Sequence, residues 1–223
     1  HSSYKEKFGI PRQPNLVQVE SYIEMLAPYN DVLAFEGIEA FSHLWLVWQF
    51  HDNKNPEKNQ FRPQVRPPRL GGNKKIGVFA TRSMYRPSQI GLSVVRLKCV
   101  KKEGKSVRVY VTGSDLLDGT PIVDIKPYIH YSDAVINAES GYAQDEPKRK
   151  SVIWSDRAIE QKQQLLMSEK LSVQTAQELE AVLSLDPRPA YQDDEARVYK
   201  MKFAAVDIAF TVGETTVNIT AVE

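Results

Sequence analysis

The chain has one cysteine, no long hydrophobic run and almost no net charge among its 223 residues. A single cysteine cannot form an internal disulfide, which excludes a small fold held together by disulfide bonds. Cys99 lies in an apolar stretch, and we interpret it as a buried structural thiol in a reducing cytoplasm. The strongest apolar run, residues 43–50, is far shorter than the roughly 20 residues of a membrane helix. We therefore expect no membrane segment.

The chain also lacks the common signatures of metal and nucleotide sites. Its four histidines show no His-x3-His spacing and there is no Cys-x2-Cys pair, so we expect no metal site. A GxxxxGK[ST] phosphate loop is absent, as is a GxGxxG turn that follows a strand and opens a helix. No signal-peptide pattern is present. The chain begins at His1 rather than Met, and we expect that sequence is missing before it.

The net charge of +1 is a cancellation between regions of the chain. Residues 61–110 contain thirteen Lys and Arg and a single acid, Glu103, which gives this segment a charge of +12. The rest of the chain therefore carries −11. A segment so basic predicts a localised surface for a polyanion such as RNA on an otherwise acidic protein.

Short apolar runs separated by turn residues fill the first 130 residues, where we find no strong helix pattern. This texture is typical of an all-β barrel or sandwich. Residues 51–69 hold four prolines and are expected to form a long exposed loop. The expected strands are 16–20, 32–35, 44–50, 76–80, 92–100, 106–112 and 121–125.

The pattern changes after Tyr131. Residues 133–152 are polar and small, and we interpret them as a linker or surface crossing. Helices are expected after Ser155 and from Ser172, and Asp186-Pro187-Arg188-Pro189 must stop the second one. The end alternates as strands 198–203, 206–211 and 217–222. We therefore predict a mainly β chain with an N-terminal barrel, residues 1–134, and a small α+β domain, residues 135–223.

Four clusters of polar and basic residues are candidates for chemistry: residues 7–14, 67–77, 79–93 and 112–128. Each cluster also has a structural interpretation. In chain order, these are a loop before the first strand, a basic turn, a polar surface loop and a turn capped by a side chain. Within them, Arg82 and Arg86 can bind phosphate or carboxylate, and Tyr85 can stack on a base. The residues around Asp118 fit an aspartate that caps a turn. No such local role explains Asp115, which is therefore the better candidate to accept a hydrogen bond from a ligand.

Five motifs in this order together resemble the TsaA-like family, also called TrmO. They are KFGIPRQP at 7–14, FSHLWLVWQFH at 41–51, RPPRLGGNKKIGVFATRSMYRPSQIGLS at 66–93, DLLDGTPIVDIKPY at 115–128 and DPRPAY at 186–191. The resemblance covers nearly the whole chain. It implies a β-barrel that carries S-adenosylmethionine, and a methyltransferase that acts on N6 of adenine 37 of tRNA. It also implies a homodimer.

The resemblance also implies which residues form the methyl-donor pocket. They are Gln13, Pro14, Asn15, Leu16, His51, Asp52, Arg82, Leu92, Thr112, Gly113, Ser114, Asp115 and Leu116. The basic segment supplies the expected RNA contacts, which are Arg66, Arg69, Lys74, Lys75 and Arg86.

The exocyclic amine of adenine is a poor nucleophile, so we expect catalysis to depend mostly on alignment of the reacting atoms. Candidates for a catalytic group are Asp115, Asp118, His51 and Tyr85. The implied acceptor is a threonylcarbamoyl-adenosine in the anticodon loop. Two other functions stay open at this stage. One is a non-catalytic RNA-binding barrel that senses S-adenosylmethionine, and the other is a small-molecule methyltransferase.

Overall fold

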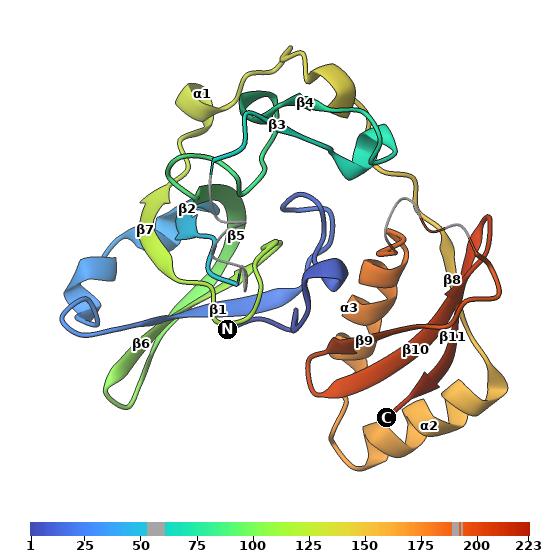
Figure 1. Ribbon diagram of the computed structural model, residues 1–223. Helices are drawn as coiled ribbons and strands as arrows, with labels where there is room; N and C mark the ends of the chain where they lie inside the picture. Colours follow the sequence, from blue (N-terminus) through green and yellow to red (C-terminus); the bar gives the residue numbers. More distant parts are fainter. Residues whose placement is uncertain (53–60, 189–191, 193) are drawn as a thin grey trace.

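The N-terminal lobe is built on a five-stranded antiparallel sheet, drawn in blue to green in Figure 1. The computed structural model describes residues 1–52, 61–188, 192 and 194–223. The strands follow the order β1-β6-β5-β2-β7 across the sheet. Their bounds are β1 Glu20–Met25, β2 His43–Gln49, β5 Ile90–Glu103, β6 Ser106–Thr112 and β7 Ile122–Pro127.

Burial alternates along β2 and β6, because successive side chains of a strand point to opposite faces. In β2, Leu44, Leu46 and Trp48 are buried while their neighbours are less so. Val95 of β5 and Val109 of β6 join them in one hydrophobic cluster. The predicted strands 44–50, 92–100 and 106–112 are confirmed, and 121–125 is confirmed with a shift of two residues at its end.

Three strand predictions were wrong or partly wrong. Residues 16–20 precede β1 except for Glu20, and Val32–Phe35 is a 3-10 helix, η2, whose Leu33 N–H donates to the Asp31 carboxylate at 3.0 Å. The predicted strand 76–80 is only the two-residue β4, Ile76–Gly77, followed by the 3-10 helix η6, Val78–Ala80. Short apolar runs of four or five residues fit one 3-10 turn as well as a strand.

The chain is mainly β, as predicted, but no closed barrel is found among the described residues, so the barrel stays a prediction. Strands β1 and β7 are the edges of the five-stranded sheet, and no ladder between them is found in the part of the chain that the structure describes. A separate two-stranded sheet pairs β3, Gln64–Val65, with β4. β3 lies within the expected 51–69 loop, whereas β4 follows that loop. Residues 53–60 of the loop lie outside the described residues.

The C-terminal lobe is a four-stranded sheet with two helices, drawn in orange to red in Figure 1. Both helices are confirmed: α2, Asp156–Met167, and α3, Val173–Leu183, begin after Ser155 and Ser172, whose hydroxyls accept from backbone N–H groups. The three C-terminal strands are confirmed as well. The sheet has the order β8-β11-β10-β9, with bounds β8 Ser151–Trp154, β9 Tyr199–Phe203, β10 Val206–Val212 and β11 Thr216–Val222.

The first residues of the chain pack on the C-terminal lobe. Tyr4, Val17 and Val19 belong to the same hydrophobic cluster as the inner faces of β9, β10 and β11. Tyr4 is 1% exposed and forms an isolated bridge with Phe203. The two lobes therefore share core residues, although each has its own sheet. The division into domains 1–134 and 135–223 remains a prediction.

A strap joins the lobes, and we define it as residues 134–150. It leaves α1, His130–Asp133, passes over the two-stranded sheet and enters β8 (Figure 1). Its 3-10 turn η7, Gly141–Ala143, contacts η5, Pro68–Leu70. The Arg69 guanidinium donates to the Asp145 carbonyl and so ties the strap to the N-terminal lobe.

Candidate functional site

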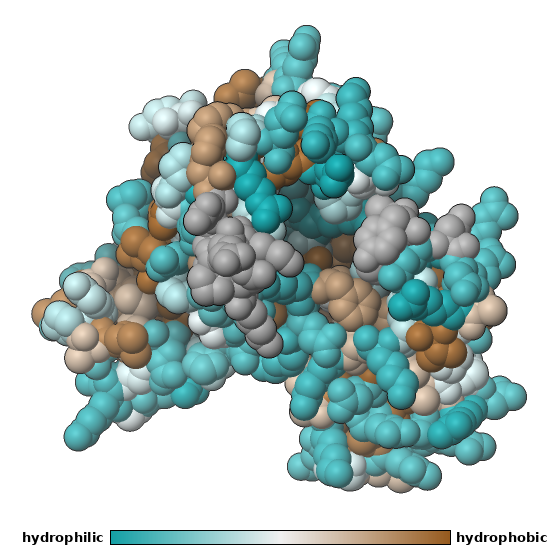
Figure 2. Space-filling view, viewed as in Figure 1, coloured by the Kyte–Doolittle hydropathy of each residue, from teal (hydrophilic) through white to brown (hydrophobic). Residues whose placement is uncertain are grey.

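A cavity of about 2200 Å³ opens between the N-terminal lobe, the strap and the C-terminal lobe. Figure 2 shows the hollow in this face, with hydrophilic residues along much of its rim. Loops supply most of its wall: residues 10–16, the ends of β2 and β5, the turn 79–86, part of the strap, and residues 185–188. Among the described residues that line it are eleven Lys and Arg and five Asp and Glu. A ligand with negative charge is therefore favoured.

More than half of the predicted donor-pocket residues line this cavity. They are Gln13, Leu16, His51, Asp52, Arg82, Leu92 and Asp115. All but Leu92, which lies in β5, come from loops that are distant in sequence. A hydrogen bond of 2.7 Å from Arg82 to the Gln13 side-chain oxygen joins two of these loops. The Lys7 ammonium lies 3.5 Å from an oxygen of the Asp52 carboxylate at the same cavity.

The other predicted donor-pocket residues do not line the cavity; they are Pro14, Asn15, Thr112, Gly113, Ser114 and Leu116. Asn15 has φ 63 and its N–H donates to the Gly113 carbonyl at 2.8 Å. Gly113 has φ +82, and a Cβ there would lie 2.4 Å from the Asn15 side-chain oxygen, so only glycine fits. Ser114 is buried with its hydroxyl 2.9 Å from that of Ser21.

Asp115 is held in place by a short chain of hydrogen bonds. The Trp48 indole N–H donates to the Ser93 hydroxyl at 3.0 Å, and that hydroxyl donates to Asp115 Oδ1 at 2.6 Å. Burial raises the pKa of the Asp115 carboxyl, while the Ser93 hydrogen bond and the charge of Arg82 act in the opposite direction. The result is a fixed acidic group on the wall of a largely basic cavity.

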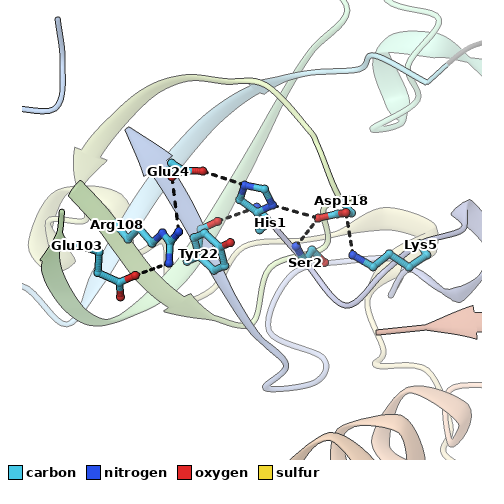
Figure 3. Close-up of polar contacts among 8 residues, drawn as sticks. All are labelled: His1, Ser2, Lys5, Tyr22, Glu24, Glu103, Arg108 and Asp118. Atoms are coloured by element: carbon cyan, nitrogen blue, oxygen red, sulfur yellow. Dashed lines mark hydrogen bonds and ion pairs between the residues drawn. The ribbon is translucent and has the colours of Figure 1, made fainter. Parts of the chain in front are cut away.

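Asp118, another predicted catalytic candidate, does not line the cavity. It accepts from the Ser2 N–H at 2.8 Å and from the Lys5 ammonium at 2.7 Å. Figure 3 shows this network, in which His1 lies between Asp118 and Glu24. Burial raises the pKa of Asp118, but the hydrogen bonds from Lys5 and Ser2 outweigh it and the pKa lies below its ordinary value. The contacts of Asp118 thus anchor the N-terminal segment, and its catalytic role stays a prediction.

Asp115, His51 and Tyr85 remain as catalytic candidates that line the cavity. Tyr85 was also predicted to stack on a base. One of its faces is covered, because the Arg62 guanidinium lies 4.2 Å from the ring centroid.

The cations of the basic segment 61–110 lie in two different settings, at the cavity and on the sheet. Four of its five predicted RNA contacts line the cavity, namely Arg66, Arg69, Lys75 and Arg86, whereas Lys74 does not. Further along the segment, Lys98 pairs with Glu20, and Arg108 pairs with Glu103 and Glu24. The cations of β5 and β6 are therefore partly neutralised on the sheet, and those of residues 62–86 are concentrated at the cavity.

Sequence reasoning missed the part of the wall that comes from residues 140 onward. Tyr142 and Lys148 of the strap line the cavity, as do Asp186 and Arg188 of the fifth motif. The cluster Lys148-Arg149-Lys150 and the motif itself were visible signals, but neither shows which surface it faces. Residues 189–191 of the motif lie outside the described residues.

Cys99, interpreted as buried, is only half-buried on β5. In the part of the chain that the structure describes, no three His, Cys, Asp or Glu side chains are grouped to hold a metal ion. No helix in this part is long and apolar enough to cross a membrane.

Residues 1–134 match the family described as tRNA-methyltransferase O N-terminal domain, and residues 147–223 match the TrmO C-terminal domain. The chain is similar to a tRNA (adenine(37)-N6)-methyltransferase of Escherichia coli K12, with 46% identity over 87% of this chain and 81% of that protein. A putative S-adenosylmethionine-dependent methyltransferase of Pseudomonas aeruginosa is 44% identical over 93% of this chain and 87% of its own length. A crystal structure of TrmO from Pseudomonas aeruginosa superposes with a TM-score of 0.79 at 34% identity, covering 100% of this chain and 93% of the other.

Proposed function

The chain belongs to the TrmO family of tRNA methyltransferases, and from this membership we infer that it methylates N6 of adenine 37 of tRNA with S-adenosylmethionine as donor. We propose further that the acceptor is the threonylcarbamoyl-adenosine of the anticodon loop. The observation that carries the proposal is the cavity itself, where a fixed carboxylate, Asp115, faces a wall rich in Lys and Arg.

The residues of the cavity fit the chemistry of S-adenosylmethionine, which has two cationic groups, a carboxylate and an adenine. Asp115 can attract a cationic group, the Arg82 guanidinium can bind a carboxylate, and Leu16 and Leu92 offer apolar surface. When bound, the donor supplies an electrophilic methyl group. We assign Gln13 and the loop around Asn15 to the same pocket. Gln13 accepts a hydrogen bond from Arg82, and the Asn15 N–H donates to the Gly113 carbonyl.

The protein's own residues contribute mostly by aligning the donor methyl group with the acceptor nitrogen. Transfer to a weakly nucleophilic amine needs the two reacting atoms in line and close together, and a polar acceptor near the amine. The catalytic candidates Asp115, His51 and Tyr85 line the cavity, and each can accept a hydrogen bond from that amine. An anticodon-loop base is already unpaired, so presenting it costs less than extracting a base from a duplex.

The test is incubation of the protein with donor labelled in its methyl group and with tRNA that either carries or lacks the threonylcarbamoyl group. Label is expected on adenine 37 of the modified tRNA. Label only on the unmodified tRNA would contradict the proposed acceptor, and donor binding without transfer to either RNA would indicate the non-catalytic function. Transfer confined to small molecules would indicate the third function.

We also propose three properties that the family resemblance supports: a closed barrel in the N-terminal lobe, a homodimer, and a boundary between two domains near residue 134. A cytoplasmic location is proposed from the single unpaired cysteine. Sedimentation at increasing protein concentration tests the dimer.

A further inference from the structure

Two phenylalanine side chains lie exposed together beside the basic cavity. Phe79 is 68% exposed and lines the cavity, and Phe61 is 49% exposed. Their ring centroids are 6.1 Å apart with an interplanar angle of 34°. Leaving an aromatic ring in water forgoes the free energy of its burial, so a pair of exposed rings at a cavity rich in Lys and Arg needs an explanation.

Phe79 lies in a turn that several hydrogen bonds of its neighbour Val78 hold in place. The preceding residue, Val78, is 1% exposed, and its N–H donates to the Pro63 carbonyl at 3.0 Å. Its carbonyl accepts from the Thr81 N–H at 3.0 Å and from the Thr81 hydroxyl at 2.8 Å. The turn therefore buries Val78 and directs the next ring to the cavity.

Arg86 completes this turn. Its guanidinium donates to the carbonyls of Thr81 and Val78 and lies 5.7 Å from the centroid of the Phe79 ring. Its sequence-based interpretation was a phosphate contact. In the structure its Nη1 donates to the backbone, and the cation lies against the ring that it supports.

The surroundings of the ring match one kind of occupant. Arg62, Arg66 and Lys75 line the same cavity, which places positive charge near an exposed aromatic surface. Single-stranded nucleic acids bind to this combination, because cations attract the phosphates and each base can stack on a ring. Tyr85 is the less open ring, since Arg62 covers one of its faces.

We propose that Phe79, with Phe61 beside it, is a stacking platform for an unpaired base of the anticodon loop, and that Arg86 is a positioning residue for this platform. The proposal rests on the proposed function, because it names how that substrate is bound. It adds a residue that contributes affinity without charge.

The experiment compares Phe79→Ala, Phe79→Leu and Phe79→Trp with the wild type in binding to an anticodon stem-loop that carries 2-aminopurine beside position 37. The Ala and Leu variants are expected to bind roughly 5- to 150-fold more weakly, with the salt dependence unchanged, because stacking releases no counterions. The Trp variant retains affinity and quenching of the 2-aminopurine fluorescence. Affinity for S-adenosylmethionine is unchanged in all three.

Wild-type affinity in Phe79→Leu would overturn the proposal, since an aliphatic side chain cannot replace a ring in stacking. A change in sedimentation with unchanged RNA affinity would also overturn it and would assign Phe79 to a contact between copies of the chain. Failure of the proposed function is a separate result: the wild type would then bind the stem-loop, with or without a Phe79 effect, but would transfer no methyl group.

Arg86→Lys and Arg86→Gln test the positioning role. If Arg86 holds the turn, both variants lose affinity to a similar extent and keep the salt dependence of the wild type. If Arg86 instead contacts a phosphate, Lys retains the salt dependence and Gln lowers it, which would contradict the assignment.

Discussion

At the scale of single residues, the half-buried carboxyl of Asp115 links stability to function. Its pKa is raised by burial, which means that the folded protein favours the neutral form more than the unfolded chain does. The stability contributed by the protonated group is complete below the unfolded pKa of about 3.9 and is lost as the pH rises through the raised folded pKa.

Asp115→Asn removes this ionisation and keeps an oxygen that can accept from Ser93. We expect the variant to gain stability relative to the wild type as the pH rises through that window, and to bind S-adenosylmethionine roughly 10- to 100-fold more weakly. Melting temperatures between pH 3.5 and 8 and calorimetric titration of the donor measure the two effects.

Asp133→Asn is the matched control, because the pKa of Asp133 is lowered by hydrogen bonds from the Ile129 N–H and the Trp45 indole. Its variant is expected to lose stability relative to the wild type as the pH rises, the opposite sign. Parallel pH profiles for wild type and Asp115→Asn would contradict the assignment of a raised pKa.

The sequence distinguished Asp115 from Asp118 only in part. Asp115 lacked a local partner, and the structure supplies one from β5, Ser93, twenty-two residues earlier. Asp118 is bound by Ser2 and Lys5, more than a hundred residues away. Such partners are set by the tertiary fold. The turn residues after Asp118 could therefore suggest a structural role for it, but they could not identify the N-terminal segment as its partner.

At the scale of elements, the pairing of β2 with β5 fixes the wall that carries Ser93. Gly91 of β5 lies opposite Trp48 of β2, and a Cβ at Gly91 would come within 2.3 Å of the indole ring. The ring cannot move freely, because its N–H donates to Ser93. Gly91 thus allows Trp48 to lie flat against the strand.

Gly91→Ala is therefore expected to lower the free energy of unfolding by about 1–3 kcal/mol through overpacking. Urea denaturation followed by tryptophan fluorescence measures it. Gly77→Ala is the control: nothing lies within 4 Å of its Cβ position, and its φ of −58 suits any residue. Equal losses in the two variants would show that the loss comes from removing a glycine rather than from the indole contact.

Element prediction succeeded where a local pattern decides the structure. Ser155 and Ser172 signalled both helix starts, alternation signalled β5 and β6, and a short run rich in Trp, Val and Leu signalled β2. It failed for β8, which pairs in parallel with β11 about sixty residues later and follows a basic cluster. The sequence contains no hairpin turn that would indicate such a strand, because its partner is distant and runs parallel to it.

At the scale of the whole molecule, a nearly neutral chain separates its charge in space as well as in sequence. The basic segment predicted an RNA-binding surface, but folding divides that segment between the cavity and the β5–β6 sheet. The sequence located the excess of positive charge in residues 61–110. It could not show which of these cations pair with Glu20, Glu24 and Glu103. Those pairings depend on strand register.

This division predicts that equal losses of charge have unequal effects on tRNA binding. Arg66 and Lys75 line the cavity, whereas Lys101 and Lys102 are exposed near the tip of the β5–β6 hairpin. Arg69 is a poorer choice because it ties the strap, and Lys74 does not line the cavity. Removal of two phosphate contacts lowers the slope of log affinity against log salt by about 0.7 to 0.9 for each contact.

We expect Arg66→Ala with Lys75→Ala to lower that slope and weaken tRNA binding, while donor affinity stays at the wild-type value. The charge-matched pair Lys101→Ala with Lys102→Ala should change neither. Long-range attraction alone would weaken binding equally in both double variants, because it depends on total charge and each removes two cations. Titrations of tRNA at three salt concentrations therefore decide whether the cavity, rather than the protein's overall charge, holds the RNA.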